Sequence, residues 1–393
     1  MARLGGANIA KLEGGLGRLA AGTDNHIGLV LLGLPVGEVA TAVNNSGKGI
    51  VITSVFEAEE LGINASFDAN NSTTAYADIV EFFRLAPEAT LYLFDKIAEA
   101  DLQGFINQNK EIKGYGFHLD YDTETPNLVT AINDHQAIVN AFSAENRFID
   151  FVIIGADNLD VYTEDLFALS APNVSVSVAC ETAGGIVAVG SALGMEAVRK
   201  VNENLGSVNI VNKPLAKRGT PDYPLTDSVL NKWPQAFLSN GDAVDSTDKS
   251  TLNGIIEKGY IVAASYEGYG GVFFENSYTC VERTSDFAFI ENNRTWNKAA
   301  RIIRGTLIPE VKSNVKKDPV TGFIAPTTVG RWKGLLSKAL EQMVSDDEIS
   351  GFEVSINPNQ VVNNTSPVTI KATIVADGVV HEFEVAVGLT NNI

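Results

Sequence analysis

The chain's last quarter reads RTWNKAARIIRGTLI at residues 294–308, TVGRWKGLLSKALEQMV at 328–344, FEVSIN at 352–357 and VTIKATIV at 368–375. The first two stretches repeat apolar residues every three or four positions, which predicts amphipathic helices. The last two alternate apolar and polar residues, which predicts strands. A turn, Asp318-Pro319-Val320-Thr321-Gly322, lies between the helices. This order contains no recognisable catalytic motif, and it indicates a docking surface followed by strands that can pair with other chains.

The first predicted helix, Arg294 to Ile308, has an apolar side and a basic side. The apolar side holds Trp296, Ala299, Ala300, Ile303 and Leu307. The opposite arc holds Arg294, Lys298, Arg301 and Arg304. Pro309 ends the helix, because proline lacks the N–H donor that another turn requires. We therefore expect one face to be buried and the other to form a ridge of positive charge.

The second predicted helix runs from about Thr328 to Val344. Its apolar stripe consists of Val329, Trp332, Leu335, Leu336, Ala339, Leu340 and Met343. Arg331 and Lys338 lie along one flank of this stripe and Lys333 along the other. This helix therefore also buries one face and offers positive charge beside it.

Both ends of the chain are predicted to be arms. A third alternating run, Val380 to Gly388, almost reaches the C-terminus, and a strand at a chain end is well placed to add to the sheet edge of another subunit. The candidate residues of this C-terminal arm are Val380, Glu382, Phe383, Val385, Val387 and Leu389. Residues 1–25 are small, polar and rich in glycine, which predicts an N-terminal arm rather than a part of a core.

The net charge of -19 is unevenly distributed along the sequence. Between Glu291 and Ser345 there are ten basic and four acidic residues, a local balance of +6, so the rest carries -25. A basic island in an acidic protein argues against direct nucleic-acid binding, which favours an overall basic domain. The better partner is an acidic protein or the acidic surface of a neighbouring copy. The alternative is that these cations only solvate the faces of surface helices.

Composition limits the protein class. With 393 residues and 45% hydrophobic content, the chain can form two or more packed units. Its start shows no signal sequence, and no stretch approaches the roughly 20 apolar residues of a membrane helix, so we expect synthesis in a cytosol. Cys180 and Cys280 form no metal or redox motif and are predicted to be buried, reduced thiols.

From His26 to Ala179, strand-like and helix-like segments alternate, which predicts a layered α/β domain with a largely parallel sheet. We expect four parts. These are an arm at 1–25, an α/β region at 26–250, a C-terminal α/β core domain at 251–378 and an arm strand at 379–393.

The search for catalytic motifs is largely negative. Ser46-Gly47-Lys48-Gly49 lacks the spacing of a phosphate loop and is predicted to be a surface turn. Glycines 184, 185, 190 and 194 do not have dinucleotide-binding spacing and are interpreted as close helix-to-sheet packing.

Acidic and histidine residues add no clear site. Asp120, Asp122 and Glu124 could hold a hard cation at a strand end, but a solvated loop is favoured over a metal site. Four scattered histidines, of which three adjoin strand-like segments, are interpreted as structural. They are His26, His118, His135 and His381.

Several short motifs follow one another in a characteristic order. They are Gly14 to Arg18 (Gly-Gly-Leu-Gly-Arg), the strand pair Gly259 to Val262 and Gly270 to Phe274, Leu307-Ile308-Pro309, Asp318 to Gly322, the acidic junction Asp346 to Ser350 and the terminal strands. This order resembles that of contractile tail sheath proteins from phages and phage-like injection systems, in particular the subfamily that carries Gly-Gly-Leu-Gly-Arg near its N-terminus. The resemblance covers about the last 135 residues well and the first 35 more loosely.

This resemblance implies a structural subunit without catalysis, cofactor or metal. Such subunits stack as six-fold rings around an inner tail tube, and their arms add strands to neighbouring subunits. Baseplate and tail terminator proteins are further implied partners, and the particle is a virion tail or an injection system assembled in a bacterial cytoplasm. Arg331, Lys333 and Lys338 are the expected tube-facing cations, and the ridge Arg294, Lys298, Arg301 and Arg304 is a second contact to the tube or a neighbour. The variable middle, about residues 36–250, would face outward.

Two other interpretations stay open. One is an α/β enzyme that binds a nucleotide or small acid with the Gly184 region and the Asp120 cluster at the carboxyl ends of its sheet. The other is a different phage tail structural protein, such as a tube or baseplate component.

Overall fold

The computed structural model describes residues 24–32, 34–35, 37–96, 99–120, 127–363, 367–381 and 383–385. The chain forms two compact units whose segments interleave along the sequence. Unit 1 comprises the described residues up to His118 together with Ala188–Val198 and Lys213–Thr220. Unit 2 comprises Leu119–Val187, Arg199–Asn212 and the described residues from Pro221 onward.

A mostly parallel sheet forms the centre of unit 1. Its strands are β1 (His26–Leu32), β2 (Ile50–Ile52), β3 (Thr90–Lys96) and β4 (Gly114–Asp120), hydrogen-bonded in the order β2-β3-β1-β4. β1 runs parallel to both β3 and β4, whereas β2 is antiparallel to β3. The continuous apolar run of β1 is buried, as expected for a strand that is covered on both faces.

Unit 1 also contains six short α-helices among its described residues. They are α1 (Glu38–Asn44), α2 (Val55–Glu60), α3 (Ala65–Asn71), α4 (Ala75–Leu85), α5 (Glu99–Gln108) and α7 (Val189–Val198). α7 packs so closely on α4 that a Cβ atom on Gly190 would lie only 2.2 Å from the Asp78 carbonyl oxygen. The glycines of this segment therefore allow close packing, as predicted, but the nearest neighbour is a helix and not the sheet.

Unit 2 contains α6 (Leu128–Ala144) and the parallel strand pair β5 (Phe151–Asp157) and β7 (Val174–Ser177). Unit 2 also contains three short antiparallel pairs and one helix. They are β6 (Ser170–Ala171) with β12 (Cys280–Val281), β8 (Ala179–Cys180) with β9 (Phe237–Leu238), β10 (Ala263–Tyr266) with β11 (Tyr269–Phe274), and α8 (Lys249–Ile256).

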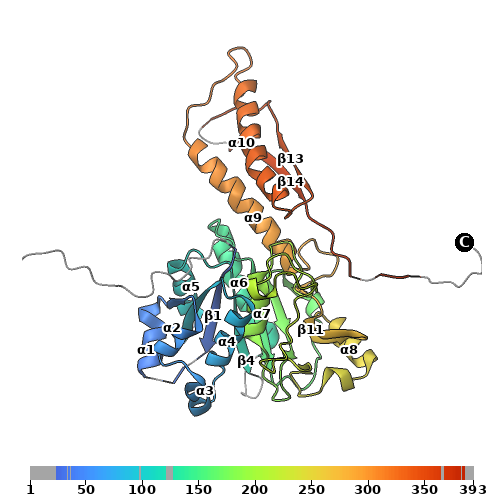
Figure 1. Ribbon diagram of the computed structural model, residues 1–393. Helices are drawn as coiled ribbons and strands as arrows, with labels where there is room; N and C mark the ends of the chain where they lie inside the picture. Colours follow the sequence, from blue (N-terminus) through green and yellow to red (C-terminus); the bar gives the residue numbers. More distant parts are fainter. Residues whose placement is uncertain are drawn as a thin grey trace, which may run out of the picture. The chain divides into compact units, whose positions relative to one another are not determined.

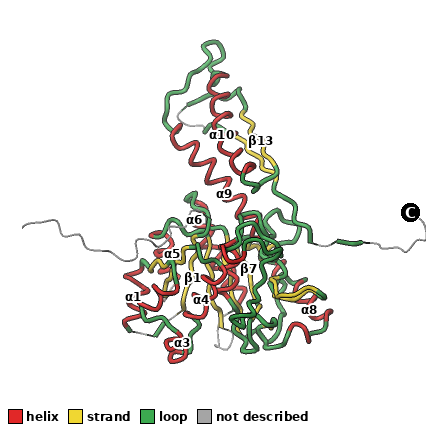
Figure 2. The backbone as a smooth tube through the Cα atoms, in the orientation of Figure 1, coloured by secondary structure: helices red, strands yellow, loops and turns green. Residues whose placement is uncertain are grey.

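The end of unit 2 is a substructure that we call the C-terminal module. It consists of α9 (Ile290–Leu307), α10 (Pro326–Ser345), β13 (Gly351–Ile356) and β14 (Ile370–Val375), coloured orange to red in Figure 1. Figure 2 shows the chain between α9 and α10 largely as a loop. β13 and β14 pair antiparallel, with Val354 opposite Ala372.

A single apolar cluster holds the C-terminal module together. The buried members are Ala299, Ile324, Trp332, Leu336, Leu340, Met343, Ile349, Val354 and Ile356. They come from α9, the loop, α10, the connection after α10 and β13, so the helical stripe and the alternating strand meet in one core. Each buried leucine side chain of this kind contributes about 1.5–3 kcal/mol through the removal of apolar surface from water.

Most predicted elements are present, and the α/β fold class is confirmed. One of the strand-like segments in the predicted alternation is the apolar run Gly49 to Phe56, which would form a single strand. This prediction is wrong beyond Ile52. There Ser54 acts as the N-cap of α2, its hydroxyl accepting a hydrogen bond from the Glu57 N–H, while the Glu57 carboxylate accepts one from the Thr53 N–H. This reciprocal cap starts a helix that the apolar run concealed.

Candidate functional site

The basic face predicted for α9 is partly buried. Arg294 is only 1% exposed, with its guanidinium near the Arg199 carbonyl oxygen and over the Phe151 ring. Trp296, which was predicted to be buried, is 44% exposed. The expectation of a solvent-facing Arg294 is therefore wrong, because the first turns of α9 are enclosed by unit 2 on their polar side.

Two further cations of α9 make ion pairs within unit 2. Lys298 Nζ lies 2.5 Å from Glu348 Oε1, and this ion pair links α9 to the segment between α10 and β13. Arg301 binds the buried Asp150 carboxylate through both terminal nitrogens, at 2.7 and 3.0 Å. Bidentate pairing of this kind fixes the guanidinium in one orientation. Among the four predicted α9 cations, only Arg304 is exposed.

All three cations of α10 are exposed, but only Arg331 makes an ion pair among the described residues. The Arg331 guanidinium binds Glu310 through both terminal nitrogens, and the Trp332 indole N–H donates to the same carboxylate at 3.0 Å. These donors, Arg331 first, lower the pKa of Glu310. Lys333 and Lys338 are exposed, and no ion pair is found for either among the described residues. The stripe of α10 is narrower than predicted, since Leu335 is 39% exposed.

The loop between α9 and α10 adds a basic hairpin. Its Asp318 carboxylate accepts hydrogen bonds from the Val320 and Thr321 N–H groups, at 2.9 and 2.8 Å, and from the Thr321 hydroxyl. Chiefly because of the Thr321 N–H, the pKa of Asp318 is lowered. This arrangement presents Val320 at the turn with 91% of its surface exposed.

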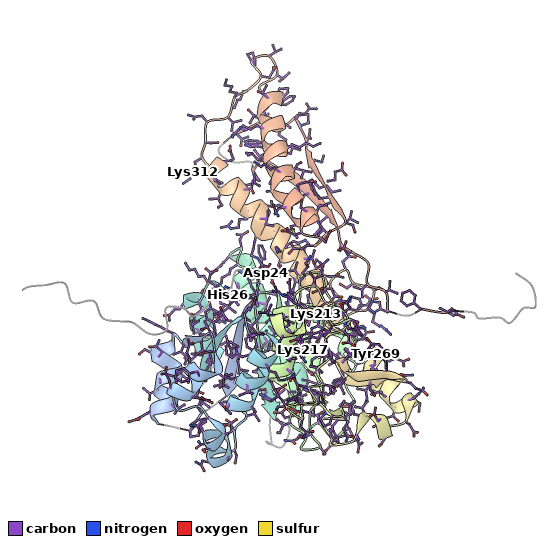
Figure 3. All side chains as sticks on the ribbon, in the orientation of Figure 1. Asp24, His26, Lys213, Lys217, Tyr269 and Lys312 are labelled. Carbon is purple, nitrogen blue, oxygen red and sulfur yellow. The ribbon has the colours of Figure 1, made fainter. Side chains whose placement is uncertain are left out.

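Three exposed lysines of this loop were not predicted as site residues. They are Lys312, which Figure 3 labels, Lys316 and Lys317. Lys317 precedes the Asp318 turn, and the Ala325 N–H donates to the Lys316 carbonyl oxygen at 2.9 Å. The signal in the sequence was the pair of lysines directly before the Asp-Pro-x-Thr-Gly turn. We call Arg304, Lys312, Lys316, Lys317, Lys333 and Lys338 the basic surface.

The predicted C-terminal arm strand is not formed in the part of the arm that the structure describes. The described residues 376–381 and 383–385 belong to no strand. Val380, Phe383 and Val385 are all exposed, Phe383 by 82%. Glu382, Val387 and Leu389 lie outside the described residues, as do Met1 to Thr23 of the predicted N-terminal arm. A strand needs a hydrogen-bonding neighbour, and none of the described strands of this chain pairs with these residues.

The candidate enzyme residues do not converge on a site in the described part of the chain. Asp122 and Glu124 lie outside the described residues, and Asp120 ends β4. The Ser46 to Gly49 segment is a turn after α1, with positive φ at Ser46, Gly47 and Gly49. The Gly47 N–H donates a hydrogen bond to the side-chain oxygen of Asn44. No group of three metal-ligating side chains gathers among the residues that the structure describes.

Histidines and cysteines have structural surroundings. His118 Nε2 lies 2.8 Å from Asp78 Oδ2, and His26 Nδ1 lies 2.9 Å from the Tyr92 hydroxyl. Cys180 and Cys280 are both free and buried, as predicted, and burial raises the pKa of each thiol. Within the described ranges, none of the helices has the length and apolar character needed to cross a bilayer.

Comparison with known proteins relates the whole chain to one family. The model of the DUF2586 N-terminal domain matches residues 4–278, and that of the DUF2586 C-terminal domain matches residues 286–393. None of the curated proteins is a significant match.

The fold is similar to that of solved sheath structures over the full chain. A chain of the sheath complex of an extracellular contractile injection system, PVC, in its contracted state is 12% identical with a TM-score of 0.60, covering 100% of this chain and 99% of that one. A chain of the anti-feeding prophage baseplate is 14% identical with a TM-score of 0.58, covering 100% of both. The sheath tail protein of Desulfitobacterium hafniense is 10% identical with a TM-score of 0.51, covering 94% of this chain and 100% of that one.

Proposed function

The chain belongs to the DUF2586 family, and from that premise we propose that it is the structural subunit of a contractile tail sheath. The observation that carries the proposal is the correspondence of fold along the whole chain with a PVC sheath-complex chain, at 100% and 99% coverage. Correspondence over a single domain would fit many assemblies. Here the two units and the C-terminal module together have sheath counterparts.

In this proposal the subunit assembles with copies of itself as stacked rings, six to a ring, around an inner tail tube. Baseplate and tail terminator proteins close the two ends. The chain is made in a bacterial cytoplasm and becomes part of a virion tail or of an injection particle. The role is structural and requires no catalysis.

Two features of the C-terminal module support assembly through strands. The β13–β14 sheet has only two described strands, so each strand leaves one edge of backbone N–H and C=O groups unpaired within the described structure. Such edges are templates for a strand from another chain. The exposed alternating residues Phe383 and Val385 provide a strand of the required pattern. We therefore assign the inter-subunit arm to residues 379–393.

The basic surface supports a second contact. Six exposed cations for which no ion pair is found in the described structure lie on α9, α10 and the loop that joins them, in a chain whose net charge is -19. An acidic surface, either of the inner tube or of a neighbouring subunit, is complementary to them. Arg294 does not belong to this contact because it is buried, and Arg301, Lys298 and Arg331 are already engaged by Asp150, Glu348 and Glu310.

Contraction in such an array needs no nucleotide. An extended array that is metastable gains new contacts between subunits as they rotate and slide, and this packing and charge pairing does the work. Arms that stay joined to neighbours keep the rings connected during the movement.

Labelling of assembled particles tests the proposal. A tagged chain is expressed in cells that carry its own gene cluster, and purified particles are stained with gold-labelled antibody for electron microscopy. Label along the full length of the tail is the expected result. Label at one end only would identify a cap or baseplate component, and unlabelled particles would refute a tail role.

Charge reversal tests the basic surface. The double substitution K333E/K338E should weaken attachment to the tube more than it weakens self-association, since it reverses two exposed cations of α10. The matched control is K110E/K249E, which makes the same change in net charge at exposed lysines of α5's following loop and of α8. If K333E/K338E weakens tube attachment and self-association equally, these lysines belong to a contact between sheath subunits and not to the tube contact.

A further inference from the structure

The C-terminal segment is tied to the body of unit 2 at Asp377. One Asp377 carboxylate oxygen accepts a hydrogen bond from the Ser350 hydroxyl at 2.5 Å, and the other accepts one from Asn202 Nδ2 at 2.6 Å. Asn202 also donates to the Asp347 carbonyl oxygen at 2.9 Å. Asp377 therefore connects the chain after β14 to both the start of β13 and a loop outside the C-terminal module.

A second contact lies four residues further along. The His381 ring stacks on Phe289, with centroids 5.3 Å apart and an angle of 26° between the planes. Phe289 in turn packs against Tyr278 at 5.4 Å. Between the two contacts, Gly378, Val379 and Val380 form part of the wall of a polar groove of about 790 Å³.

These two contacts differ in strength. Asp377 uses both carboxylate oxygens in hydrogen bonds, which are stronger when the acceptor is charged. His381 is exposed and is held by one ring contact. A single aromatic contact is easily broken, and its loss changes an equilibrium by about two- to tenfold.

We propose that Asp377 is the fixed root of the C-terminal arm and that the His381–Phe289 contact is a releasable hold that keeps the arm on its own subunit until assembly. His381 lies inside the alternating run that is proposed to pair with another copy, so the run cannot complete a strand while this ring stays on Phe289. The root sets where the arm leaves the body. The hold competes with pairing. This inference rests on the proposed sheath function.

Substitutions at the two contacts should act in opposite directions. H381A removes the hold and should lower the protein concentration at which sedimenting polymers appear by about two- to tenfold, the range expected for one aromatic contact. H381F keeps an aromatic ring on Phe289 and should stay near the wild-type threshold. D377A frees the root, so the arm samples more directions, and the threshold should rise.

Hydrogen–deuterium exchange on the unassembled chain tests the contacts independently of assembly. Amides of residues 378–381 should exchange faster in H381A and D377A than in the wild type, and H381F should restore protection. If the exchange rates of these amides in both alanine variants equal those of the wild type, the Asp377 and His381 contacts do not hold this segment, and the proposal is overturned.

The polymerisation series tests the competition. A threshold that is unchanged in H381A, or that moves in the same direction in H381A and D377A, would overturn the hold while leaving the sheath function standing. If the wild type and all variants fail to polymerise and gold-labelled particles show no label, the sheath function itself fails. Melting temperatures within the error of the wild type confirm that each variant is folded.

Discussion

Arg294 is buried and Trp296 is 44% exposed, the reverse of what the polarity of the two side chains suggests. The Arg294 guanidinium lies over the Phe151 ring and close to the Arg199 carbonyl oxygen, so its charge has partners inside unit 2. An arginine can be buried where carbonyl oxygens and an aromatic face replace water around its planar fork. Helical periodicity alone does not reveal such partners.

Arg301 should stabilise the fold more than its neighbour on the basic surface, Arg304. R301A leaves the 1%-exposed Asp150 side chain with the Asn297 amide, at 2.9 Å, as its remaining side-chain partner found here. We expect a loss of about 2–3 kcal/mol, below the roughly 3–5 kcal/mol of a fully buried pair because Arg301 is partly exposed. Urea unfolding measures this loss.

The control is R304A, which removes an exposed cation of the same helix and should change stability by less than about 0.5 kcal/mol. Equal effects of the two substitutions would show that the Asp150 pair does not contribute.

The Asp318 turn should be sensitive to acid. Its folded-state pKa lies below the ordinary value of 3.8, so the carboxylate stabilises the turn fully above that value and the effect is lost as the pH falls through the lowered pKa. Hydrogen exchange at the Thr321 amide should be protected at neutral pH and lose part of that protection in D318N. Protection that is the same in D318N and wild type would mean that the backbone alone holds the turn.

At the scale of elements, α10 offers a matched pair of leucines. Leu336 is fully buried in the cluster of the C-terminal module, whereas Leu335 is 39% exposed. L336A should destabilise the protein by about 2–5 kcal/mol, because it removes apolar contacts and leaves a cavity. L335A should have a much smaller effect, and chemical denaturation of both variants gives the comparison. Similar losses would show that the stripe is as broad as its sequence pattern suggests.

The elements themselves follow closely from local pattern. The α10 stripe and the alternation of β13 and β14 predicted both types correctly, with Pro326 at the start of the helix, where its missing N–H needs no partner. The pattern was wrong where an apolar run served two elements, as at Ile52 to Phe56. For the run after Val380, the described residues form no strand within this chain, and its pairing with another copy stays a proposal. Period and length cannot resolve either case.

At the scale of the whole molecule, the arm should be required for assembly and dispensable for folding. Deletion of residues 380–393 removes described side chains that are exposed, among them Val380, Phe383 and Val385. We expect a folded monomer with nearly the wild-type melting temperature that forms no long polymers, as measured by calorimetry and sedimentation. Long tubular assemblies of the deletion variant would refute the arm assignment.

By itself, the sequence determined the type and order of the elements, the α/β class, the buried thiols and a basic C-terminal region in an acidic chain. These properties depend on the period, charge and polarity of neighbouring residues. Only the tertiary structure decided which cations are free to bind a partner. Three of the predicted cations form ion pairs with carboxylates that are distant in sequence: Arg301 with Asp150, Lys298 with Glu348 and Arg331 with Glu310. It also brought Asp377 to Ser350 and Asn202, and His381 to Phe289. Such contacts join residues whose spacing along the chain carries no signal, so they form only when the whole fold brings them together.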